Sequence, residues 1–208
     1  MNNTINQSEH KLILRERILS EARKNFREYG IKAVKMDDIA RQLCISKRTL
    51  YELFQNKEEL LYESVNDFYE LFDDRIRKAE EKGETVIDIL VDVYQLQLEE
   101  FSKSKPIFYS DLKKYKDAWS IIEKHQKSRT VMLLNYFNQG VEEGCFRPGV
   151  NYEIVSHIVI ASMDYVVKGS IYEIYPIHEI YRNMQQMFLR GICTEKGLKI
   201  LDRKLSEL

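Results

Sequence analysis

Residues Met36 to Phe54 read MDDIARQLCISKRTLYELF, and this pattern predicts two short helices joined by a tight turn. The first helix has apolar residues at helical spacing on one side: Met36, Ile39, Ala40 and Leu43. Ser46 is a favourable N-cap for the second helix because its hydroxyl can accept a hydrogen bond from a free backbone N–H. Leu50 and Phe54 are four residues apart, so they would turn one side of the second helix inward.

The opposite side of the second helix would present polar side chains to solvent: Lys47, Arg48, Thr49, Tyr51 and Glu52. In a helix–turn–helix the second helix enters the DNA major groove, with its first residues at the base edges. Arg and Lys bind guanine edges or phosphates, and Thr and Tyr hydroxyls bind phosphates. The sequence therefore predicts direct DNA contacts from Lys47, Arg48, Thr49 and Tyr51. Two short helices with a polar outer face also occur in helical proteins that bind no DNA.

Basic residues on both sides of this stretch are further candidate DNA contacts. Asn56 and Glu59 form a capping pair that would start the next helix. Lys57 would lie in the first turn of that helix, where the positive end of the helix dipole favours a phosphate. An amphipathic helix is predicted from Lys11 to Tyr29, and its basic N-terminal end would bring Arg15 near the DNA backbone.

The longer stretch from Gly30 to Leu61, GIKAVKMDDIARQLCISKRTLYELFQNKEELL, resembles the DNA-binding segment of the tetracycline-repressor (TetR) family. The matching residues are Gly30, Ile39, Ala40, Ser46, Thr49, Leu50, Tyr51, Phe54, Lys57 and Leu60. Two positions depart from the family pattern. Lys35 stands where Ser or Thr is usual, and Asp37 stands where a basic or polar residue is frequent. The resemblance implies a transcriptional regulator, most often a repressor, that binds operator DNA as a dimer and responds to a small molecule.

The composition indicates a helical protein with one basic end. A hydrophobic content of 44% supports a packed core, and only 3 Pro and 8 Gly favour long helices. The formal net charge is −1, but residues 1–60 hold 12 Lys and Arg against 9 Asp and Glu. A basic head on a more acidic body is typical of a protein that contacts DNA with one end.

The compartment is predicted from what the sequence lacks. The first ten residues are polar, are expected to have no regular structure and contain no apolar segment of a secretory signal. No run of about 18 apolar residues occurs. The three cysteines, at positions 44, 145 and 193, are not spaced as a metal or redox pair, so buried thiols in a reducing compartment are expected. We therefore expect a cytoplasmic protein.

The predicted fold is all-α, with about nine helices. A three-helix DNA-binding domain at residues 11–60, with its helix–turn–helix core at 36–54, precedes a larger helical ligand-binding and dimerisation domain at 61–208. The later helices are predicted at 56–82, 84–104, 107–115, from Asp117 to the turn at Gly144, from Asn151 onward, and at 177–192. The tail from Thr194 is polar and would dock only loosely.

The last two long helices are the predicted homodimer interface. The first is apolar on most sides and the second carries an apolar stripe, which suits pairing with a second copy, although packing within the chain alone would also explain them. A two-fold dimer would present two DNA-binding heads to half-sites about one turn of DNA apart, roughly 34–36 Å, so the expected operator is palindromic.

A small organic effector is the other partner that the resemblance implies, held in a cavity of the second domain. The candidate lining residues are Phe68, Phe72, Tyr94, Phe101, Tyr109, Trp119, Tyr136 and Met163. Tyr and Trp would place hydrogen-bonding groups in an apolar wall. Aromatic residues at helical spacing are, however, usually core residues that bind nothing.

Catalysis, cofactors and metals are not predicted. The four histidines form no metal-binding pair, and the chain has neither a Gly-rich phosphate loop nor a G-x-S-x-G motif. Two alternatives to a DNA-binding regulator remain open from the sequence: a helical interaction module without DNA binding, and a helical enzyme that uses the aromatic cavity.

Overall fold

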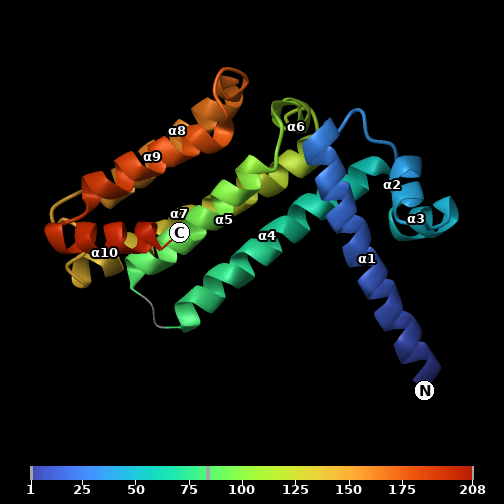
Figure 1. Cartoon of the computed structure of the whole chain (residues 1–208), viewed down its shortest axis with the longest axis horizontal. Helices are drawn as coiled ribbons and strands as arrows, with labels where there is room; N and C mark the ends of the chain where they lie inside the picture. The colour runs from blue at the N-terminus through green and yellow to red at the C-terminus, as the bar shows by residue number, and fades with distance from the viewer. Residues whose placement is uncertain (1, 83–84, 208) are drawn as a thin grey trace. The chain divides into compact units, whose positions relative to one another are not determined.

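A computed structural model describes residues 2–82 and 85–207, and its regular elements there are all helical (Figure 1). The elements are α1 (Asn2–Tyr29), α2 (Met36–Gln42), α3 (Lys47–Leu53), α4 (Lys57–Glu81), α5 (Val86–Ser102), α6 (Pro106–Leu112), α7 (Lys116–Glu142), α8 (Tyr152–Lys168), the 3-10 helix η1 (Ile171–Glu173), α9 (Ile177–Ile192) and α10 (Glu195–Ser206). The all-α prediction is confirmed. The predicted helix start at Glu84 lies outside the described residues.

The chain divides into two compact units. The N-terminal unit comprises the residues up to Glu70 together with Lys103–Ile122, and the C-terminal unit comprises Leu71–Ser102 together with the residues from Glu123 on. The division therefore falls within α4 and within α7. It groups α6 with the first three helices, whereas the sequence predicted a boundary after residue 60.

The core of the N-terminal unit joins α1, α2, α3 and the start of α4, together with the end of α6 and the start of α7. Its buried side chains are Ile18, Leu19, Ala22, Phe26, Ile31, Val34, Met36, Ile39, Ala40, Leu50, Phe54, Leu60, Leu61, Leu112 and Ala118. Leu50 and Phe54 are fully enclosed, as their spacing predicted. At an average of about 25 cal/mol per Å² of buried apolar surface, such a core is the main force that holds these short helices together.

Gly30 ends α1 and lets α6 approach it. Its φ of +80° lies in the left-handed region, which a residue with a side chain rarely adopts. A Cβ at this position would lie 2.7 Å from a side-chain carbon of Ile107 in α6. The backbone N–H of Lys105 also donates to the carbonyl of Arg27 at 3.0 Å. The contact of α6 with the end of α1 therefore depends on a glycine.

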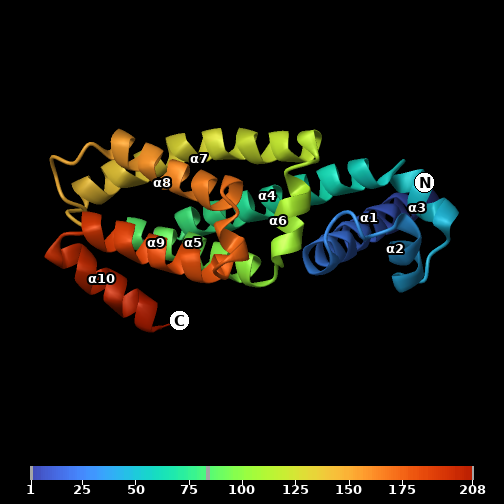
Figure 2. The same ribbon diagram turned by 90° about the horizontal axis from the view of Figure 1, so that it is seen from above.

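The C-terminal unit is a bundle around α5. Helices α5, α7, α8 and α9 run alongside one another in both views, and α5 contacts α9 and α10 (Figures 1 and 2). The turn after α7 pairs with the segment between α9 and α10, because the Arg147 N–H donates to the Ile192 carbonyl and the Thr194 N–H donates to the Cys145 carbonyl, both at 2.9 Å. No helix among the described residues is long and apolar enough to span a membrane.

The structure differs from the predictions made from the sequence at both ends of the chain. The first helix begins at Asn2, so the expectation of an unstructured N-terminus up to His10 is wrong. The tail forms the capped helix α10, in which the Thr194 hydroxyl accepts from the Gly197 N–H at 3.2 Å. Leu201 of this helix is buried, so the tail is packed rather than loosely docked. The Thr cap and the apolar spacing were signals in the sequence that pointed to this helix.

Candidate nucleic-acid interface

The outer face of α3 is polar and accessible. The side chains of Lys47 and Arg48 are 66% and 88% exposed, and Tyr51 is 46% exposed. Thr49 is half-buried at the N-terminal turn, whereas Leu50 is completely enclosed on the other side of the helix. The helix start is set as predicted, because the Ser46 hydroxyl accepts from the Thr49 N–H at 3.0 Å.

The polar residues of α3 already have partners within the helix–turn–helix. Lys47 Nζ lies 2.6 Å from Asp37 Oδ2 of α2, and Arg48 Nε donates to Glu52 Oε1 at 2.8 Å. The hydrogen bond to Glu52, and then its charge, raise the pKa of Arg48 above its ordinary value. Exposed pairs of this kind contribute little to stability and exchange readily for other partners. The two cations therefore remain available to an approaching nucleic acid.

Lys57 lies at the start of α4 but does not point freely into solvent. Its ammonium donates to three backbone carbonyls of the connection between α1 and α2: Ile31 at 2.9 Å, Val34 at 3.0 Å and Lys32 at 3.3 Å. An ammonium has three N–H donors, so these bonds use all of them. Contact with a phosphate would require at least one of these bonds to break.

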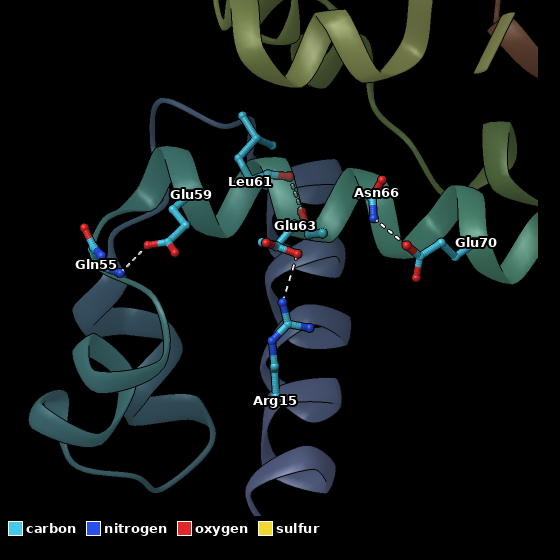
Figure 3. Close-up of polar contacts among 8 residues, drawn as sticks. Arg15, Gln55, Glu59, Leu61, Glu63, Asn66 and Glu70 are labelled. Atoms are coloured by element: carbon cyan, nitrogen blue, oxygen red, sulfur yellow. Dashed lines mark hydrogen bonds and ion pairs between the residues drawn. The ribbon is translucent and has the colours of Figure 1, made fainter. Parts of the chain in front are cut away.

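Arg15 is bound to α4 in a similar way (Figure 3). Its guanidinium pairs with Glu63 at 2.9 Å and lies over the ring of Phe54, 5.4 Å from the ring centroid. About two turns further along α1, Arg23 pairs with Asp67 at 2.7 Å. Arg15 and Arg23 thus tie α1 to α4. The first turn of α4 is fixed at Glu59, whose carboxylate accepts from the Gln55 N–H at 2.5 Å (Figure 3).

Asn25 and Asp111 are buried polar residues that the sequence analysis did not single out, and both hold this unit together. The side-chain amides of Asn25 and Gln42 bond each other reciprocally, at 2.7 and 3.2 Å, and join α1 to α2. Asp111 of α6 is 3% exposed and accepts from the Lys32 N–H at 2.8 Å. These pairs are 17 and 79 residues apart in the chain, so spacing alone gave no signal for either.

The eight candidate lining residues of an effector cavity divide between the units. Phe68, Tyr109 and Trp119 belong to the N-terminal unit, where Trp119 packs against the core. Phe72, Tyr94, Phe101, Tyr136 and Met163 belong to the C-terminal unit.

Within the C-terminal unit, Tyr181 brings two of these residues together. Its ring stacks on Tyr94 with centroids 5.7 Å apart and meets Phe101 edge-on at 5.0 Å. The Tyr181 hydroxyl donates to Gln97 at 2.9 Å, and burial raises its pKa. Tyr181 was not among the residues predicted from the sequence to line this site. Tyr136 lies elsewhere in the unit and donates to Glu80 at 2.7 Å.

The N-terminal unit matches a known family model. Residues 18–63 fit the model described as "Bacterial regulatory proteins, tetR family", which covers the C-terminal part of α1, the whole of α2 and α3, and the first turns of α4. The match therefore contains most of the core, the outer face of α3, and Lys57 with the carbonyls that it binds, but not Arg15.

Whole-chain comparisons agree with this match. The HTH-type transcriptional repressor KstR2 of Mycobacterium tuberculosis (strain H37Rv) is 27% identical over 150 residues, which cover 70% of this chain and 75% of the relative. The solved structure of the ketosteroid transcriptional regulator KstR2 of the same species has a TM-score of 0.59 at 23% identity and covers 87% of this chain and 95% of that chain.

A second solved structure is similar in fold, a putative transcriptional regulator from Saccharomonospora viridis in complex with choline. Its TM-score is 0.69 at 16% identity, and the match covers 88% of this chain and 98% of that chain. These relatives are named as regulators or repressors of transcription rather than as enzymes. Residues 18–63 are thus similar to the DNA-binding segment of the TetR family, and together with the relatives of the whole chain they indicate a DNA-binding transcriptional regulator.

Proposed function

We propose that this chain is a repressor that binds a palindromic operator as a homodimer and leaves it when a small organic effector binds. The observation that carries the proposal is the outer face of α3, which presents Lys47, Arg48 and Tyr51 to solvent on a helix anchored by the enclosed Leu50. Together with Thr49 at the helix start, these are the proposed contacts to DNA. Lys57 and Arg15 support them, because Lys57 fixes the connection between α1 and α2 and Arg15 fixes α1 against α4.

Selection of bound duplexes from a random pool tests DNA recognition and symmetry together. A palindromic consensus with half-sites about one turn of DNA apart is the expected result. Recovery of no sequence would contradict operator binding and favour a helical interaction module. On the selected duplex, Arg48→Ala should reduce affinity by about 1–3 kcal/mol and relax the preference at one base pair. Equal weakening on all sequences would make Arg48 a phosphate contact.

The proposed dimer interface lies on α8 and α9. Ile154, Ile158 and Tyr165 recur on one side of α8 and are all about half exposed or more, with Tyr165 at 67%. On α9, Met187 is 64% exposed, and a Cβ at Gly191, four residues further on, would meet nothing within 4 Å. An exposed apolar stripe beside a helix position with no side chain suits a second copy of these helices.

A charge placed on this stripe tests the dimer. Ile158→Glu should shift the chain to the monomer in sedimentation experiments and abolish cooperative binding to the palindrome, because the charge would be buried at the two-fold interface. Val131→Glu is the matched control, since Val131 is 63% exposed on α7, outside the proposed interface. A dimeric Ile158→Glu variant would exclude this face as the interface.

The proposed effector site is the cluster of Tyr94, Phe101 and Tyr181 in the C-terminal unit. Aromatic rings with hydroxyl groups suit a flat or amphipathic molecule, or a quaternary ammonium such as the choline held by the Saccharomonospora viridis regulator. A true effector should raise the melting temperature of the chain and lower its affinity for the operator. Tyr94→Ala should remove both effects while operator binding without effector persists. Choline is the first probe.

A further inference from the structure

The helix–turn–helix carries as many carboxylates as cations. Residues 36–54 contain three of each and have no net formal charge. Each cation lies within 3.2 Å of one carboxylate, in the pairs Lys47–Asp37, Arg48–Glu52 and Arg41–Asp38. The basic surplus of the first sixty residues therefore lies outside the surface that is proposed to enter the groove.

The Asp37–Lys47 pair differs from the other two because it joins the two helices. Its atoms are 2.6 Å apart, and the residues are ten positions apart in the chain. The adjacent residue Met36 and the α3 residue Leu50 are buried in the same core, so packing holds both ends of the pair in place. The side chains are 66% and 42% exposed, and a DNA phosphate can therefore reach the cation and its partner alike.

Such a pair lowers the affinity for non-operator DNA and the affinity for operator DNA by unequal amounts. Binding to non-operator DNA is almost entirely attraction between cations and phosphates. A lysine that already has a carboxylate partner gains less from a phosphate, because the carboxylate must be released or must stay beside a phosphate that it repels. In the operator complex, hydrogen bonds to base edges fix the position of α3, and Lys47, which has three N–H donors, can donate to a base edge without leaving Asp37. Operator affinity therefore depends less on the competition for Lys47.

We propose that Asp37 is a specificity-determining residue whose carboxylate competes with DNA phosphates for Lys47. This competition weakens binding to non-operator DNA more than binding to the operator, and so increases the ratio of the two affinities. The inference rests on the proposed function, since it presupposes an operator. Asp37 is also one of the positions at which this chain departs from the family pattern.

The full chain carrying Asp37→Asn tests the proposal. Its affinity is measured over a range of salt concentrations for two duplexes, one recovered by selection and one with the same bases in scrambled order. Affinity for the scrambled duplex should rise roughly two- to fivefold, the change that corresponds to one exposed ion pair. The slope of log affinity against log salt should steepen by about 0.9, as Lys47 takes up a phosphate.

Operator affinity should rise less, so that the specificity ratio of Asp37→Asn falls below that of the parent chain. An equal rise on the two duplexes, or no rise on the scrambled one, would overturn the proposal. In a Lys47→Gln background the effect of Asp37→Asn should almost vanish. An undiminished effect there would show that Asp37 acts on the DNA directly and not by competing for Lys47.

Asp202→Asn is the matched control. Asp202 pairs with Arg190 at the same distance of 2.6 Å, but in the C-terminal unit. Asp202→Asn changes the net charge by the same amount as Asp37→Asn and should leave the specificity ratio unchanged. If the ratio fell as much as it does in Asp37→Asn, the effect of Asp37 would be due to net charge alone. Failure to select any duplex would contradict the proposed function itself, and an unchanged ratio on a selected operator would contradict only this inference.

Discussion

Two pairs of polar residues, Lys57 and Asp111 in the N-terminal unit and Tyr136 and Tyr181 in the C-terminal unit, differ in what their side chains bind. In the N-terminal unit, Lys57 and Asp111 bind backbone groups of the connection between α1 and α2. In the C-terminal unit, the tyrosines at the centre of the bundle bind other side chains, as Tyr136 binds Glu80 and Tyr181 binds Gln97. The first arrangement fixes the course of the main chain, and the second fixes only the orientation of a ring.

This difference matches what each unit is proposed to do. A surface that reads DNA must keep its side chains in one position, which backbone anchored by charged and buried groups provides. A site that admits an effector must exchange contacts without unfolding, and side-chain hydrogen bonds in an aromatic wall can change partners while the helices stay in place. Substitutions in the two units should therefore have different effects on stability and on DNA binding.

The largest expected effect is in the C-terminal unit, at Tyr181. Tyr181→Ala removes a buried ring from its contacts with Tyr94 and Phe101, and the free energy of unfolding should fall by about 3–5 kcal/mol. Tyr181→Phe keeps the ring and loses only the hydroxyl bond to Gln97, so about 0.5–1.5 kcal/mol is expected. Denaturant unfolding measures both, and similar losses for the two variants would show that the hydroxyl, and not the ring, holds the bundle.

A smaller effect, in the N-terminal unit, is expected at Lys57. Lys57→Met keeps the apolar stem but leaves three carbonyls without their donor, so the free energy of unfolding should fall by about 1–2 kcal/mol. Lys24→Met in the same unit is the control, because Lys24 is 77% exposed and its nearest carboxylate oxygen is 3.8 Å away. This control should change stability by less than about 0.5 kcal/mol.

DNA binding by Lys57→Met separates an anchor from a phosphate contact. As an anchor, Lys57 affects the position of α3, so affinity should fall while the dependence of log affinity on log salt keeps its slope. A lost phosphate contact would instead lower that slope by about 0.9. The second outcome would mean that the lysine leaves the carbonyls when DNA binds, and that the N-terminal unit is less fixed than its hydrogen bonds suggest.

The sequence predicted those parts of the structure that follow from local patterns. Ser46 and Asn56 cap the helices they were expected to cap, since a cap depends on residues three positions apart. The ion pair between Arg48 and Glu52, four residues apart on α3, could have been read from the sequence in the same way.

Polar contacts between residues far apart in the chain could not be predicted from the sequence. Nothing in the spacing of Asp111 and Lys32 indicates that one binds the other, because that bond depends on how α6 packs against α1. The residues proposed to contact DNA were likewise chosen by helical periodicity, which gives the exposed face of α3. It does not reveal that Lys57 is turned toward carbonyl groups.

The smallest expected effect is at Cys44, in the turn between α2 and α3. Cys44 has a φ of 55°, in the left-handed region that disfavours residues with a side chain. It is exposed, so the prediction of a buried thiol is wrong at Cys44, although Cys145 and Cys193 are buried. Cys44→Gly should therefore raise the free energy of unfolding by about 0.5–1 kcal/mol, which thermal unfolding can detect. Cys44→Ala keeps the Cβ and should give no gain. Ser170 has a φ of 57° in the C-terminal unit, so Ser170→Gly tests whether relief of the same backbone strain raises the free energy of unfolding there. A gain at Cys44 without one at Ser170 would mean that strain lowers the stability only of the unit proposed to read DNA.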